Sequence, residues 1–274
     1  MNASAGLALP GGWAAYLSGM LLVMVRISCL MVTAPIFSSE VIAPRVKVAF
    51  VLLLTLLVAP VAAALPGTEA NDAHVQHVSQ LSFRAIAGEL AAGSVFGLEL
   101  TLFSEILLFA GQLLGFQFSF SLVNLLDPYA PYQTPLLGQL FSLFGTLLLF
   151  ASGLYRELLL ALLRSFRAAP PGMVWLGGES GLTIVARVGG VLLAGLELAA
   201  PVLAATLLVE VAIAVLGRVA PQLPVMMLSI PVKTLVGYGA LSAGLALWPR
   251  FLENRFADLL DAGESLLRQM AVGH

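Results

Sequence analysis

The stretch that decides the fold runs from Ile86 to Leu126 and reads IAGELAAGSVFGLELTLFSEILLFAGQLLGFQFSFSLVNLL. It is almost wholly apolar, yet three acids, Glu89, Glu99 and Glu105, lie within it. At 1.5 Å per residue, a helix of about forty residues would be roughly 60 Å long, twice the thickness of a bilayer's hydrocarbon layer. The run is therefore too long for one simple membrane crossing.

Two features bear on how this run ends. Either the helix breaks near Gly111 and Gly115, or it extends well beyond the bilayer. Asp127 precedes Pro128, and a residue before proline is pushed out of the α region. We expect the run to stop at Asp127-Pro128 in either case.

The rest of the chain is similarly apolar. Of its 274 residues, 59% are hydrophobic and 10% are charged, and the mean hydropathy is +0.98. Further apolar runs cover residues 13–32, 46–65, 135–163, 184–219 and 223–248. This composition is typical of a membrane-inserted protein, with room for about six spans of about 20 residues. Because the alternation typical of transmembrane strands does not recur, we predict an all-α fold.

Four more charged residues fall in apolar runs, namely Arg26, Arg187, Glu197 and Glu210. An ionised side chain at bilayer depth costs at least about 2.5–3.5 kcal/mol unless protein or water receives it. Glu89 and Glu105 lie roughly 160° apart on a helix, whereas a proton relay would gather such acids on one face. We interpret all seven as structural buried charges. We expect helices that are surrounded by protein on several sides, with counterparts supplied by neighbouring subunits, or helices that lie partly outside the hydrocarbon.

The end of the long run has an unusual pattern. Phe116, Phe118 and Phe120 alternate with polar residues, and Asn124 follows. This alternation favours an extended or irregular segment over a helix. Irregular backbone at membrane depth is tolerated where protein or a water-filled cavity satisfies it. The segment therefore either lines or obstructs a passage, or forms an aromatic core patch.

Small residues recur at helical spacing in the same run. Gly93 and Gly97 form one pair four residues apart, and Gly111 and Gly115 form another. Such pairs let helix backbones approach closely. We expect close helix packing at both.

The C-terminal tail, residues 250–270, differs from the preceding runs. Its apolar residues fall near helical spacing, with charged residues between them. Two interpretations stay open: a helix that packs on the body of the protein, or a helix that docks a partner.

Signatures of catalysis are missing from the sequence. There is no His-Glu-x-x-His zinc motif, no Gly-x-Ser-x-Gly elbow and no phosphate-binding Gly-rich loop with a Lys. Cys29 is the only cysteine, and no charge block suggests nucleic acid. We expect no enzyme, cofactor, metal site or nucleic-acid partner. A small-solute transporter is the main rival, but the inverted repeat that it predicts is not evident.

Two segments carry a resemblance to a known family. The first contains Arg26, Thr33-Ala34-Pro35-Ile36-Phe37 and Pro44-Arg45-Val46-Lys47. The second is Gly217-Arg218-Val219-Ala220-Pro221-Gln222-Leu223, followed by Pro231 and Gly237. Together they resemble the FliR/SctT family of type III export-apparatus proteins over about residues 10 to 250. The flagellar branch is the closer match, through Arg218, Pro221, Gln222 and the segment from Gln117 to Asp127-Pro128, and the injectisome branch is the alternative.

The resemblance implies an architecture and a set of partners. It implies bent helical hairpins, with a P-like part at 1–167 and a Q-like hairpin at 182–250. The amphipathic tail at 251–274 lies outside these two parts. The implied partners are FliP- and FliQ-type export-gate subunits, FlhB- and FlhA-type proteins and unfolded flagellar export substrates. The implied location is the flagellar basal body in the bacterial inner membrane, with much of the assembly on the periplasmic side.

The resemblance also assigns a role to the Phe-rich segment. In this family the matching region, about 111–127 here, forms a plug in the export channel. Its candidate residues in this sequence are Gly111, Gly115, Phe116, Phe118, Phe120, Asn124, Asp127 and Pro128.

Overall fold

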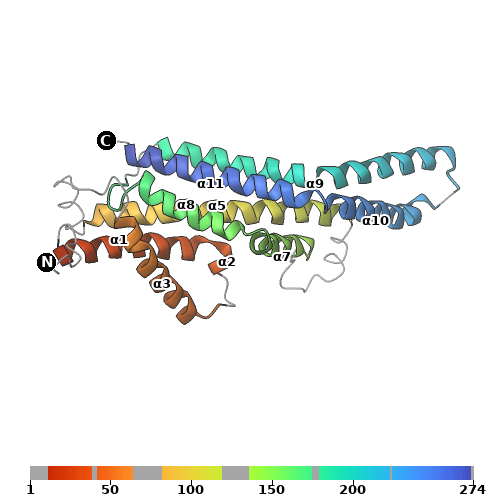
Figure 1. Ribbon diagram of the computed structural model, residues 1–274. Helices are drawn as coiled ribbons and strands as arrows, with labels where there is room; N and C mark the ends of the chain where they lie inside the picture. Colours follow the sequence, from red (N-terminus) through yellow and green to blue (C-terminus); the bar gives the residue numbers. More distant parts are fainter. Residues whose placement is uncertain are drawn as a thin grey trace, which may run out of the picture. The chain divides into compact units, whose positions relative to one another are not determined.

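The computed structural model describes residues 12–38, 42–63, 82–118, 136–174, 179–222 and 224–272. Every regular element in these ranges is a helix, which confirms the all-α prediction. The chain divides into two compact units. Unit 1 holds Met1–Thr101, Tyr155–Ala186 and Ala257–His274, and unit 2 holds Leu102–Leu154 and Arg187–Phe256. Figure 1 labels the helices.

The first two apolar runs form the helices expected of them. Helix α1 spans Gly12–Thr33, the short α2 spans Pro35–Ser38, and α3 spans Pro44–Ala63. Helices α1 and α3 pack together in unit 1. Their shared core includes Val23, Ile27 and Met31 from α1 and Val51 and Val58 from α3.

The described part of the long third run forms one helix, α5, over Phe83–Gln117. The helix continues through Gly111 and Gly115, so a break at these glycines is wrong. The rest of the run, from residue 119 on, lies outside the described residues, and the extension beyond the bilayer stays a prediction. A glycine inside a helix costs only about 1 kcal/mol relative to alanine. At Gly111 the absence of a side chain permits close packing, because a Cβ there would lie 2.5 Å from the Cα of Gly138.

The fourth run is interrupted, which the sequence interpretation missed. Helix α7 spans Leu136–Ala151, and α8 spans Leu154–Ala168. Gly153 between them has φ 73°, a left-handed conformation that glycine adopts without steric cost. A glycine within an apolar run gives little sign of such a break, because glycines also occur inside continuous helices.

The fifth and sixth runs form a hairpin in unit 2. Helix α9 spans Glu179–Val219 and continues through Pro201, and α10 spans Val225–Gly244. Figure 1 shows α10 returning alongside the end of α9. A Cβ at Gly217 in α9 would lie 3.5 Å from Val225, so the two helices lie close where they join.

The C-terminal tail forms helix α11, Trp248–Val272. Its apolar side chains Leu252, Phe256, Leu260, Leu267 and Met270 are buried, which confirms a helix packed on the body of the chain. In unit 2 the ring of Phe256 meets that of Phe103 edge-on at 5.1 Å.

Four described helices are long and apolar enough to cross a membrane. These stretches are Tyr16–Thr33, Pro44–Ala62, Phe83–Gln117 and Val185–Val219. The number rises to six if the pairs α7–α8 and α10–α11, each bent at a short break, count as one span apiece.

Candidate functional site

The predicted plug segment begins in unit 2, on the last turns of α5. Ala110 and Leu114 of this helix are fully buried. Gly111 lies against α7, because a Cβ at that position would be 2.8 Å from the Gly138 nitrogen. The close approach predicted for Gly111 is confirmed, whereas nothing lies within 4 Å of a Cβ at Gly115.

Phe118 follows the last helical residue of α5 and packs against α10. Its side chain is only 5% exposed. Its ring stacks on that of Tyr238, with centroids 5.0 Å apart and planes 19° from parallel. A Cβ at Gly237 would lie 2.9 Å from the ring's Cζ, so the ring occupies the space that this glycine leaves. Phe118 is therefore held by α10, the second helix of the hairpin.

Gln117 is held by α9, the first helix of the hairpin, through a hydrogen bond. Its side-chain Nε2 donates to the hydroxyl of Thr206 on α9 at 2.8 Å. The buried Thr206 hydroxyl in turn shares its one proton between the Val202 and Leu203 carbonyls, each at 3.0 Å. A hydroxyl has one donor and two acceptor positions, and this arrangement uses the donor and one acceptor.

Phe116 lies in different surroundings from Phe118. Its side chain is 70% exposed. Residues 116 and 117 are helical, so the extended conformation predicted for the start of the alternation is wrong. Positions two apart on a helix point about 200° away from each other, so this spacing puts one ring in the core and the other outside. Phe120, Asn124, Asp127 and Pro128 lie outside the described residues.

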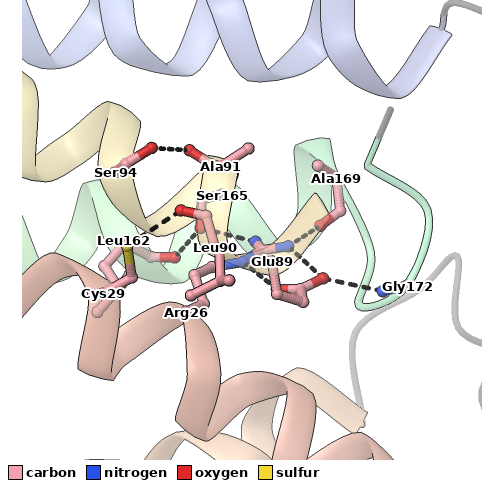
Figure 2. A network of polar contacts seen from close by, with 10 residues as sticks. All are labelled: Arg26, Cys29, Glu89, Leu90, Ala91, Ser94, Leu162, Ser165, Ala169 and Gly172. Carbon is pink, nitrogen blue, oxygen red and sulfur yellow. Dashed lines mark hydrogen bonds and ion pairs between the residues drawn. The ribbon is translucent and has the colours of Figure 1, made fainter. Parts of the chain in front are cut away.

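A buried ion pair joins three helices of unit 1 (Figure 2). Arg26 on α1 donates from Nε and Nη2 to the two carboxylate oxygens of Glu89 on α5, at 2.6 and 3.1 Å. Both side chains are 0% exposed. Such a bidentate pairing matches the planar fork of guanidinium to the carboxylate.

The remaining polar atoms of this pair also have partners. Arg26 donates to the Ser165 hydroxyl on α8 at 3.1 Å and to the Ala169 carbonyl at 2.9 Å. The backbone N–H of Gly172, at φ 85°, donates to Glu89 at 2.9 Å. The guanidinium also lies 4.3 Å from the centre of the Phe166 ring. The pair is thus desolvated, and each of its nitrogen and oxygen atoms has a hydrogen-bond partner.

The other predicted buried charges differ in how far the chain buries them. Glu99 is buried in unit 1. Glu105 is exposed and Arg187 is half-buried. Glu197 and Glu210 are exposed too, with side chains 41% and 45% accessible, and they pair with Arg255 and Lys233. The chain itself therefore does not bury Glu105, Glu197 or Glu210.

The expectation that neighbouring subunits supply the counterparts is wrong for three of the acids. Glu89, Glu197 and Glu210 pair with Arg26, Arg255 and Lys233 of the same chain. The partners are 63, 58 and 23 residues apart in sequence, so helical periodicity gave no sign of the pairing.

The residues of the second family segment lie where α9 meets α10. Arg218 is in the last turn of α9, and Pro221 and Gln222 are in the turn that follows. All three are exposed. Sequence reasoning missed Thr206 and Tyr238 as contacts of the plug segment, although Gly237 was already in the family pattern.

In the ranges that the structure describes, no group of three or more His, Cys, Asp or Glu side chains could hold a metal ion.

Comparison with known proteins gives one consistent result. The model of the family "Bacterial export proteins, family 1" matches residues 17–259. The chain is 29% identical over 248 residues to the flagellar biosynthetic protein FliR of Pectobacterium carotovorum subsp. carotovorum, covering 90% of this chain and 92% of that relative. It is 25% identical to the proteins of the same name from Escherichia coli strain K12, over 94% and 96% of the two chains, and Bacillus subtilis strain 168, over 92% and 95%.

Proposed function

Because the chain belongs to the bacterial export proteins, family 1, we propose that it is a core subunit of the flagellar type III protein export gate. With FliP- and FliQ-type partners it forms the channel through which unfolded flagellar subunits cross the bacterial inner membrane. FlhB- and FlhA-type proteins adjoin the gate, and much of the assembly lies on the periplasmic side. The single observation that carries the proposal is the family match over residues 17–259, supported by relatives with a flagellar name.

The surface of α9 supports a place inside an assembly. Exposed apolar side chains in the part of α9 that belongs to unit 2 include Leu192, Leu193, Leu207, Leu208, Val211 and Val215. An exposed apolar surface of this kind marks an interaction site with protein or membrane. The exposed carboxylates of Glu197 and Glu210 lie on the same helix. Each forms an ion pair within the chain but stays exposed, and lipid would penalise an exposed charge, so protein neighbours are the more favourable surroundings.

Copurification tests membership of the gate. An affinity-tagged chain, coexpressed with FliP- and FliQ-type subunits, is expected to bring both through detergent extraction in one complex. Imaging of that complex would show the path of the helices. A chain that purifies alone, crosses the bilayer by itself and moves a small solute would overturn the proposal.

The plug is the part of the proposal that carries a mechanism. An apolar side chain such as that of Phe116 blocks ions and water, yet it gives way to an unfolded chain because apolar contacts are non-directional. One feature of the described part of the segment supports this role. The side chain of Phe116 is exposed, so the packing of unit 2 does not bury its ring.

Removing the aromatic rings is expected to make the gate leak. Replacing Phe116, Phe118 and Phe120 together by Gly should raise ion conductance of the purified gate in vesicles, while FliP- and FliQ-type subunits still copurify. The exposed ring of Phe116 is apolar bulk that would exclude water, and the loss of the Phe118 ring would free the start of the segment from α10. Unchanged conductance in an intact complex would count against the plug.

The flagellar branch is preferred to the injectisome branch because the relatives named above are flagellar proteins. Complementation distinguishes the two. The chain should restore swimming to a flagellated host that lacks its own counterpart.

A further inference from the structure

Phe118 differs from Phe116 in its surroundings, because it is buried against α10 whereas Phe116 is exposed. We propose that Phe118 is a positioning residue, which anchors the start of the segment to the α9–α10 hairpin and so holds the gate closed. The anchor consists of Gln117 and Phe118 at the end of α5, together with Thr206, Gly237 and Tyr238. The inference rests on the proposed gate function and goes beyond it, since it assigns these residues separate roles.

The fit at Gly237 is the first observation behind the anchor. Phe118 is 119 positions earlier in the sequence, yet its ring lies where a side chain at Gly237 would be, 2.9 Å from Cζ to a Cβ. Real Cβ atoms do not approach a ring so closely, so any other residue at 237 must displace the ring. The adjacent Tyr238 then holds the ring by stacking.

A polar contact fixes the neighbouring residue on the other helix of the hairpin. Gln117 binds Thr206 on α9, whereas Phe118 binds α10. Two consecutive residues therefore attach the end of α5 to both helices.

The contrast with Phe116 shows what the anchor leaves free. The Phe116 side chain is 70% exposed, whereas that of Phe118 is 5% exposed. A ring committed to the hairpin is not available to seal a channel. Phe118 therefore determines where the segment starts, and the sealing function falls to aromatic residues outside the anchor.

Four variants of the copurified gate test the anchor by ion conductance in vesicles. Gly237→Ala should displace the Phe118 ring, and Phe118→Ala should remove it. Each is expected to raise conductance roughly 2- to 12-fold, the factor that corresponds to the loss of one aromatic pair. The double variant should leak no more than either single one, because both act on the same contact. Thr206→Val keeps the packing volume, removes the hydroxyl, and should also raise conductance.

Gly239→Ala is the matched control. It lies on the same helix α10, and nothing lies within 4 Å of a Cβ there. It carries the same change in helix propensity as Gly237→Ala and should conduct as the wild type does.

The outcomes separate the anchor from the gate. If the triple Phe variant leaks while Gly237→Ala and Thr206→Val do not, the anchor is wrong and the gate stands. If the two single effects at Gly237 and Phe118 add in the double variant, they do not share a contact and the anchor is also wrong. If Gly237→Ala fails to assemble, Thr206→Val alone decides, and unchanged conductance in that variant overturns the anchor. Failure of the wild-type chain to copurify with its partners would instead overturn the gate.

Discussion

Arg26→Met is expected to destabilise unit 1 by about 3–5 kcal/mol, because it leaves a buried carboxylate without its counter-charge. Glu89 would keep the Gly172 N–H as a partner but lose both guanidinium bonds. Ser165 and the Ala169 carbonyl would each lose a donor as well. The measurement is thermal unfolding of the purified chain in detergent, together with its abundance in membranes. Arg26→Lys should be only a partial substitute, because an ammonium group cannot form the bidentate fork.

The pair Arg255–Glu197 provides the matched control for this prediction. It joins the same two residue types in unit 2, but its side chains are 36% and 41% exposed. Exposed pairs contribute about 0–1 kcal/mol, so Arg255→Met should change the melting temperature little. Equal effects of the two substitutions would show that burial does not set the strength of the Arg26 pair.

A compensating variant separates the cost of the lone charge from the value of the pair. Arg26→Met combined with Glu89→Leu removes both charges and fills the space with apolar atoms. Replacing a buried ion pair by apolar residues of similar volume is often neutral for the stability of the protein, or even stabilising. We expect the double variant to regain a large part of the lost stability. If it is as unstable as Arg26→Met alone, the unpaired Glu89 carboxylate is not the cause.

The helical content was predictable because apolar runs of this length have few alternatives in a membrane. The helices α1 and α3 begin and end within a few residues of the apolar runs. The amphipathic spacing of the tail correctly indicated which face of α11 is buried, from Leu252 to Met270.

The pairing of charges was not predictable, because it depends on which helices adjoin. Arg26 was recognised as an anomalous charge in an apolar run, and this was correct. Its acceptor Glu89 is 63 residues away in sequence, on a helix with acids at several angles. Only the packing of α1 against α5 selects Glu89 from among them.

The plug segment shows how one pattern supports two conformations. Alternation of aromatic and polar residues has the period of a strand, which led to the extended interpretation. In the helix that the structure shows for 116–117, residues two apart still point in nearly opposite directions. A helix and a strand would therefore both bury one ring and expose the other. The sequence could not show that the buried ring, that of Phe118, packs against α10.

Gly93→Ala is expected to cost about 1–3 kcal/mol by overpacking where α1 crosses α5. A Cβ at Gly93 would lie 2.8 Å from the Cys29 Cβ and closer still to the Arg26 carbonyl oxygen. Four residues along, a Cβ at Gly97 would lie 2.6 Å from the Thr33 Cβ. The close approach predicted for this glycine pair is thereby confirmed. Neither helix backbone can give way cheaply, because the α1 carbonyl belongs to the residue that holds Glu89. Thermal unfolding of the purified chain measures the cost.

Gly189→Ala on α9 supplies the control, since nothing lies within 4 Å of a Cβ there. It should be neutral or stabilise by up to about 1 kcal/mol through helix propensity. The decisive comparison is Gly93→Ala combined with Arg26→Met. If the glycine substitution acts by shifting the Arg26 backbone, it should cost little stability once the ion pair is gone. The double variant should then lose less stability than the sum of the losses in the two single variants. Full additivity would mean that the crossing of α1 and α5 and the Arg26–Glu89 pair stabilise unit 1 independently.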